Sequence, residues 1–151
     1  MTPWFNTEER LGLLRAAAES WIKTPFVPNA AVKGHGVSCQ KLVGSIYLEV
    51  GFEGGDFIIP DADMHWGGAS KESLITAFMK DRKEFQLVEG PAAPGDTVGF
   101  KIGGCIHHCG IVLRSDGRFI HAIRNSGTIF SSLRDATYQT RLQAIWRPVC
   151  L

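Results

Sequence analysis

Residues 36–51 read Gly-Val-Ser-Cys-Gln-Lys-Leu-Val-Gly-Ser-Ile-Tyr-Leu-Glu-Val-Gly, and this stretch decides how the rest of the chain is interpreted. Its apolar side chains recur at the spacing of one helical face, namely Leu42, Val43, Ile46, Tyr47 and Val50. Ser38 is of a type that caps a helix start, and Gly51 is of a type that ends a helix. The stretch therefore predicts an amphipathic helix that begins with Cys39.

A thiol in the first turn of a helix lies beside unpaired backbone N–H groups and the positive end of the helix dipole. This environment can lower a thiol pKa from about 8.5 to roughly 3.5–7.5, and the thiolate is the form that attacks a carbonyl carbon. Cys39 is therefore the candidate nucleophile. A buried cysteine that merely starts the apolar stripe fits the same pattern.

The composition limits the classes of partner. A chain of 151 residues with 44% hydrophobic content suits one domain, residues 1–151. Sixteen basic and fifteen acidic residues, without a run of one sign, argue against nucleic-acid and membrane-surface partners. No secretory signal and no membrane span is predicted, so we expect a cytoplasmic location, or export by a route not visible in the sequence. The oligomeric state is left open.

Helical patterns come first in the chain and strand patterns follow. Helices are predicted from Thr7 toward Pro25, over 39–50, and from Ser70 to about Arg82. Strands are predicted at 86–88, 97–101, 107–113, 118–123, 128–130 and 142–147. This order predicts the α+β class, with N-terminal helices packed on an antiparallel sheet of about five to six strands. The irregular stretches 24–37 and 51–68 are expected to be loops near a cleft.

Histidines on two consecutive predicted strands are candidates for a base beside Cys39. A cysteine nucleophile needs a base within hydrogen-bond reach, and a third polar group usually holds that base. In an antiparallel hairpin with a two- or four-residue loop, His108 and His121 share one face of the sheet. His107 and Cys109 are then expected on the opposite face.

The register of this hairpin stays open at the level of sequence. A tight loop at residues 116–117 would pair His121 with Val112. A four-residue loop over 113–116 would set His121 directly opposite His108.

Segments spread over nearly the whole chain resemble the NlpC family of papain-like cysteine peptidases. They are Trp-Ile-Lys-Thr-Pro-Phe (21–26), Lys-Gly-His-Gly-Val-Ser-Cys-Gln-Lys-Leu-Val (33–43), Pro-Gly-Asp-Thr-Val-Gly-Phe (94–100), His-Cys-Gly-Ile-Val-Leu (108–113) and Phe-Ile-His-Ala (119–122). The resemblance implies a papain-like hydrolase that cleaves an amide or peptide bond, in cell-wall (murein) peptides or related small peptides, through a thioester. It makes Cys39 the nucleophile, His108 the general base and His121 the group that orients the imidazole, with no metal or cofactor.

The chain departs from the family pattern around the nucleophile. Ser38 stands where Asp is usual, Gln40-Lys41 replace Ser-Gly, and Phe26 replaces a Tyr. The resemblance places Phe26, Ser38 and Gln40 next to the substrate, and we expect Trp66 of the long loop to close over the same side of the cleft. Because the usual acidic group is missing, we expect an N-blocked or more apolar acyl group to be preferred over a free amine.

Other readings of the same residues remain open. Thiolate and imidazole are zinc ligands, so a metal site built from Cys105, His107, His108, Cys109 and His121 is one alternative. A binding or assembly module of the same fold, as in phage tails, is a second. Acyl transfer through the same thioester is a third.

Overall fold

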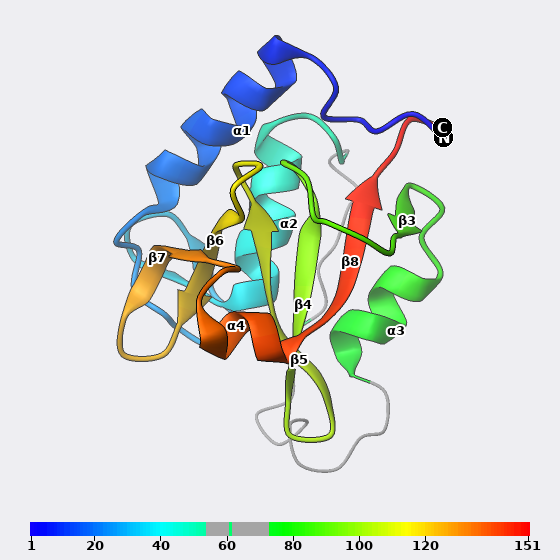
Figure 1. The fold of residues 1–151 in the computed structure, drawn as a ribbon. Coiled ribbons are helices and arrows are strands. Elements are labelled where there is room, and N and C mark those ends of the chain that lie inside the picture. The colour runs from blue at the N-terminus through cyan, green and yellow to red at the C-terminus, as the bar shows by residue number, and fades with distance from the viewer. Residues whose placement is uncertain (54–60, 62–72) are drawn as a thin grey trace.

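The structure, a computed structural model, describes residues 1–53, 61 and 73–151. Its elements are α1 (Glu8–Trp21), β1 (Ala31–Val32), β2 (Gly36–Val37), α2 (Cys39–Glu49), α3 (Leu74–Lys80), β3 (Phe85–Leu87), β4 (Thr97–Ile102), β5 (Cys105–Val112), β6 (Arg118–Ile123), β7 (Gly127–Ser132), α4 (Ala136–Arg141) and β8 (Leu142–Pro148). Six strands form one antiparallel sheet in the order β3-β8-β4-β5-β6-β7 (Figure 1). The predicted α+β class is confirmed.

The two faces of the sheet are covered by different helices. Apolar side chains of α1, α2 and α3 form one core with Ile111, Ile120 and Trp146 of the sheet. Phe100, Phe119 and their neighbours form a second, smaller core on the opposite face, where Tyr138 of α4 packs. No helix in the described ranges is both long and apolar enough to cross a membrane. In Figure 1, α2 runs behind the central strands and α4 lies in front of them.

The helix starts follow local hydrogen bonding. Thr7 Oγ1 accepts from Arg10 N at 3.2 Å at the start of α1, as the sequence predicts. Ser73, not Ser70, caps α3, since its Oγ accepts from Thr76 N at 3.0 Å; Ser70 lies outside the described residues. Ser38 occupies the cap position of α2, but its side chain makes no capping hydrogen bond, contrary to expectation.

The sequence does not predict three short elements, namely β1, β2 and α4. The stretch 24–37 is not only a loop, because β1 and β2 pair within it. The helix α4 follows Asp135, whose Oδ1 accepts from Thr137 N at 2.9 Å. Its residues carry no apolar stripe, so periodicity could not reveal it.

Strands β5 and β6 pair in a register that neither predicted loop gives. Ile111 faces Ile120 and Val112 faces Phe119, so His121 lies opposite Gly110. The connecting loop has four residues, but it spans 114–117, because the amide of Leu113 still donates to the carbonyl oxygen of Arg118. The predicted shared face holds nevertheless, and His108 becomes a diagonal neighbour of His121.

The alternation that the sequence predicts for 107–109 is not regular at His107. In the pairing of β4 with β5, Phe100 faces His108 and Lys101 faces Ile106, so His107 is the extra residue of a β-bulge. The bulge interrupts strict alternation at this point. Cys109, beyond the bulge, does lie on the α2 face as expected.

An ion pair joins the start of β4 to the end of β8. Arg147 donates from Nε to Asp96 Oδ1 at 2.9 Å and from Nη2 to Oδ2 at 2.8 Å. The Asp96 side chain is buried, and Oδ2 also accepts from Ala93 N at 2.8 Å. This two-point contact fixes the sheet near the meeting point of both chain ends, where Trp4 N donates to Pro148 O (Figure 1).

Replacing Asp96 with Ala should destabilise the protein by about 3–5 kcal/mol, because the Arg147 guanidinium is left without its carboxylate. At about 2–4 °C per kcal/mol this lowers the melting temperature by roughly 6–20 °C, measured by circular dichroism. The matched control is Asp116→Ala, which removes the exposed pair with Arg114 and should cost about 1 kcal/mol or less. Equal losses of stability in the two variants would contradict this account.

Candidate active site

A cleft opens where β5 and β6 part. The two strands pair at only two positions, although β5 extends back to Cys105 and β6 onward to Ile123. The cleft has a volume of about 390 Å³. Its lining includes Phe26, Asn29, Ser38, Cys39, Gln40, Phe100, His107, His108, Arg124, Tyr138 and Arg141. Residues from both faces of the sheet therefore meet at this open end.

Cys39 is the first residue of α2, and its side chain is almost fully buried at the cleft. Its Sγ lies 3.5 Å from Gln40 Oε1, and Gln40 Nε2 donates to Asn29 Oδ1 at 3.3 Å. The amides of the first helical turn have no intrahelical acceptors, so the dipole of α2 favours negative charge on this sulfur.

Two neighbours hold the pKa of the Cys39 thiol well below its ordinary value. The larger cause is a hydrogen bond with the side chain of Cys109, and His108 adds a hydrogen bond and a charge interaction. Burial acts in the opposite direction. The same contact and burial raise the pKa of Cys109, so of the two thiols it is Cys39 that ionises.

A hydrogen-bonded line of side chains extends from His108 into the protein. His108 Nε2 lies 2.7 Å from His121 Nδ1, and His121 Nε2 lies 2.8 Å from Ser131 Oγ. The ring of His108 stacks on Phe100, with centroids 5.7 Å apart. Both rings are thus held in place, and the remaining nitrogen of His108, Nδ1, takes no part in this line.

His121 is enclosed by aromatic rings. Its ring centroid lies 4.6 Å from that of Phe119 and 5.1 Å from that of Tyr138. Burial, with a smaller contribution from the charge of His108, lowers the pKa of His121 to about 3. His121 is therefore neutral near pH 7 and can accept a hydrogen bond from His108.

Gly110 makes room for this arrangement. A Cβ atom at this position would lie 2.5 Å from the carbonyl oxygen of Ile120 and 3.2 Å from Cβ of His121. Any larger residue would push β6 away at its last pairing with β5. The Gly in the segment His-Cys-Gly is therefore a steric requirement of the histidine pair.

The structure brings most of the residues chosen from sequence to this one cleft. Phe26, Ser38 and Gln40 line it together with Cys39 and His108. The hydroxyl of Ser38 is buried and has no hydrogen-bond partner among the described residues. Trp66 and its neighbour His65 lie outside the described residues.

Sequence reasoning missed Ser131, Tyr138 and Cys109 as parts of the site. In the pairing of β6 with β7, Ile129 faces His121, and Ser131, two residues further along β7, lies on the same face as Ile129. Only the register of the two strands reveals that Ser131 is near His121. Tyr138 lies on the unpredicted α4, for which Asp135 as a possible cap was the available signal. The sequence predicts Cys109 on the face of the sheet opposite His108, and on that face its side chain contacts Cys39 of α2.

The residues considered as zinc ligands are divided between separate contacts. His107 Nε2 lies 3.0 Å from Cys105 Sγ, whereas His108 bonds to His121 and Cys109 interacts with Cys39. Among the described residues, no three His, Cys, Asp or Glu side chains converge as ligands of one ion would.

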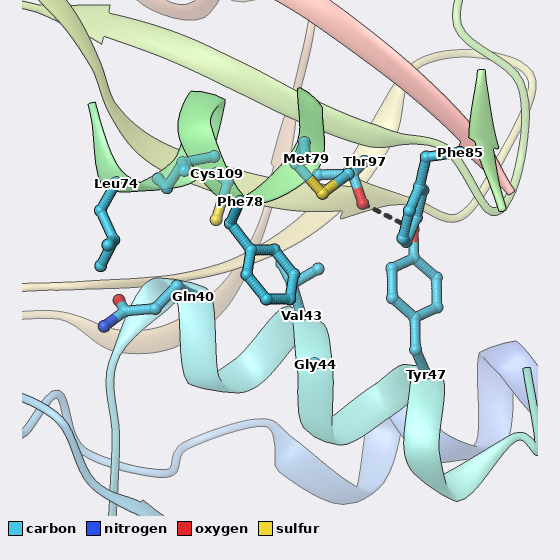
Figure 2. A pocket seen from close by; sticks show the side chains of 11 residues that line it. Gln40, Val43, Gly44, Tyr47, Leu74, Phe78, Met79, Phe85, Thr97 and Cys109 are labelled. Atoms are coloured by element: carbon cyan, nitrogen blue, oxygen red, sulfur yellow. Dashed lines mark hydrogen bonds between the residues drawn. The ribbon is translucent and has the colours of Figure 1, made fainter. Parts of the chain in front are cut away.

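A second cavity lies between α2, α3 and the sheet. Figure 2 shows Gln40 at one end of it and Tyr47 with Phe85 at the other, with Val43, Phe78 and Met79 between them. Its volume is about 40 Å³ and its walls are almost entirely apolar, while Cys39 and His108 do not line it. The reactive groups therefore face the larger cleft.

The fold is papain-like, and three solved structures that share it are NlpC/P60 proteins. A Staphylococcus aureus protein described as similar to a lipoprotein of the NLP/P60 family aligns over 100% of this chain and 45% of its own, with TM-score 0.69 and 19% identity. The NlpC/p60 domain of the peptidoglycan hydrolase SagA aligns over 89% of this chain and 96% of its own, with TM-score 0.58 and 18% identity.

A Bacillus cereus NlpC/P60 family protein aligns over 89% of this chain and 39% of its own, with TM-score 0.62 and 18% identity. The chain thus spans less than half of the Staphylococcus and Bacillus proteins. No protein-family profile and no curated protein matches the sequence. The predicted resemblance to the NlpC family is confirmed as a shared fold.

His108 and His107 can be separated by the reactivity of Cys39. In a Cys105→Ser, Cys150→Ser background, His108→Gln should slow iodoacetamide labelling of Cys39 at pH 6 by about tenfold or more, because the thiolate loses its cationic neighbour. His107→Gln should change the rate by less than about twofold. Peptide mapping by mass spectrometry identifies the labelled cysteine, and the reverse pattern would refute the pairing of Cys39 with His108.

The buried neutral state of His121 predicts an acid-dependent loss of stability. Between pH 6.5 and about 3 the unfolded chain binds a proton at this histidine that the folded protein does not, so unfolding is favoured as pH falls. As pH falls through this window, the unfolding free energy of the wild type should decrease by up to about 1.4 kcal/mol per pH unit more than that of His121→Asn.

Urea denaturation at a series of pH values measures this slope. The exposed His35, replaced with Asn, is the control and should keep the wild-type slope. A His121→Asn slope equal to that of the wild type would show that His121 is protonated in the folded state.

Proposed function

We propose that this chain is a cysteine hydrolase of amide or peptide bonds. One observation carries the proposal: the Cys39 thiol, at the start of α2, shares a cleft with the buried line His108–His121–Ser131. Each part of a nucleophile, a base and a group that orients the base is present.

The proton positions follow from the charged state of the pair. When His108 is an imidazolium, its Nε2–H donates to Nδ1 of His121. The neutral His121 then carries its own proton on Nε2 and donates it to Ser131 Oγ. In the neutral state, the same arrangement leaves Nδ1 of His108 as the acceptor for the Cys39 proton. His121 acts as a positioning residue and Ser131 fixes its tautomer.

The reaction then proceeds through a thioester. His108 takes the thiol proton, Cys39 Sγ attacks the carbonyl carbon, and an amide of the first turn of α2 stabilises the oxyanion. The imidazolium returns the proton to the leaving amine. Water, activated by His108, hydrolyses the thioester and restores the thiol.

We assign the substrate to cell-wall (murein) peptides or related small peptides. The support is the fold shared with the NlpC/p60 domain of the peptidoglycan hydrolase SagA, which this chain matches over 96% of that domain. The size of the cleft, about 390 Å³, suits a short peptide rather than a folded protein.

Incubation with a panel of murein fragments, followed by mass analysis of the products, tests this proposal. The wild type should cleave an amide bond in at least one fragment. Cys39→Ala should abolish cleavage, and His108→Ala should reduce kcat by about 10²–10⁴.

Cys150→Ser, a change at a thiol remote from the cleft, should leave kcat unaltered and serves as the matched control. Cleavage that survives in Cys39→Ala would overturn the assignment of the nucleophile. The absence of cleavage across the panel would refute the murein substrate.

A further inference from the structure

Apart from the reactive Cys39 and the histidines, the charged side chains that line the cleft are arginines and carry positive charge. Arg124 enters it from the turn after β6, and Arg141 enters it from the last turn of α4. No Asp or Glu is among the described residues of the lining. The overall charge of the chain is only +1, so this single-sign lining is a local property of the cleft.

Both guanidinium groups are available to a ligand. Arg124 lies over the ring of Phe26, 5.1 Å from its centroid, and both arginines are exposed. Neither forms an ion pair with a residue that the structure describes. By contrast, Arg147 is bound by Asp96 and Arg114 by Asp116.

Ser38 adds a second, independent polar feature. Ser38 is 2% exposed and lines the cleft, and its buried hydroxyl has no hydrogen-bond partner within the described part of the chain. An unpartnered buried hydroxyl is costly, and it can donate a hydrogen bond to an oxygen of a bound molecule. It stands directly before Cys39, so such an oxygen would lie near the reacting bond.

These features set the sign of the charge that the cleft accepts. Two cations that line one cleft, beside low-dielectric walls, attract an anion and repel an ammonium group, and salt screens this effect. A guanidinium and a hydroxyl are also the donors that bind a carboxylate. A free substrate amine would meet no carboxylate of the described lining.

We propose that the substrate of this cleft bears a carboxylate close to the scissile bond, and that Arg124 and Arg141 select it. This inference rests on the proposed hydrolase function and names the substrate class more narrowly: an acidic peptide, not a peptide with a free amine beside the bond. The arginines are specificity-determining residues, and the chemistry of Cys39 does not depend on them.

The test compares two thiol reagents that differ in charge. These are the anionic sulfonatoethyl and the cationic trimethylammonioethyl methanethiosulfonates, used on the full chain with Cys105 and Cys150 replaced by Ser. Mass spectrometry follows the modification of Cys39. The ratio of the two rates is divided by the ratio for N-acetylcysteine methylamide, which cancels intrinsic reactivity and the thiolate fraction.

The corrected ratio should favour the anionic reagent by about tenfold or more at low salt, and it should shrink in 0.5 M NaCl. The double variant Arg124→Gln, Arg141→Gln should bring it to within about threefold of unity. Arg134→Gln, which removes the same charge from an exposed position outside the cleft lining, should keep the wild-type ratio. A corrected ratio of one or less in the wild type, or a ratio unchanged in the double variant, would overturn the proposal.

The reagents react without hydrolysis, so the two proposals fail separately. A chain that cleaves murein fragments but shows no anionic preference refutes the charge selection alone. A chain with the anionic preference that cleaves no murein fragment refutes the murein substrate, while the cleft remains a site for a carboxylate-bearing ligand.

Discussion

The separation of β5 from β6 is the constraint on which the site depends. Backbone pairing between them ends at Ile111 and Ile120, close to Gly110, where no side chain can be tolerated. A continuous sheet would keep the helical face and the histidine face apart, since residues on opposite faces cannot touch through paired strands. Because the strands part, the thiol at the start of α2 meets an imidazole from the other face.

Burial determines the hydrogen bonding and the protonation states of these groups. Polar side chains taken out of water must bond to one another, and His108, His121 and Ser131 do so in one line. The same burial keeps His121 neutral, which allows it to accept from a charged His108. Cys39 is also buried, but its neighbours outweigh burial and favour the thiolate. One buried environment thus favours the charged form of Cys39 and the neutral form of His121.

The surrounding scaffold holds these groups through contacts far from the cleft. Tyr47 of α2, fully buried, donates to the carbonyl oxygen of Gly95 at 2.8 Å and lies 2.6 Å from Thr97 Oγ1, which ties the helix to the start of β4 (Figure 2). Asp96, between these two residues, is bound to β8 through Arg147. The segment Pro-Gly-Asp-Thr thus links α2, β4 and β8.

The sequence by itself determined the α+β class, the helix that begins with Cys39, and the common face of His108 and His121, because these depend on local periodicity and on parity along a strand. It did not determine the β5–β6 register or the bulge at His107, since both depend on strand pairing and on loop geometry. Ser131 and Arg141 reached the site only through the position of β7 and the short α4. The contact of Cys39 with Cys109, and the charge of the cleft, arise from residues distant in sequence, so only the tertiary structure could decide them.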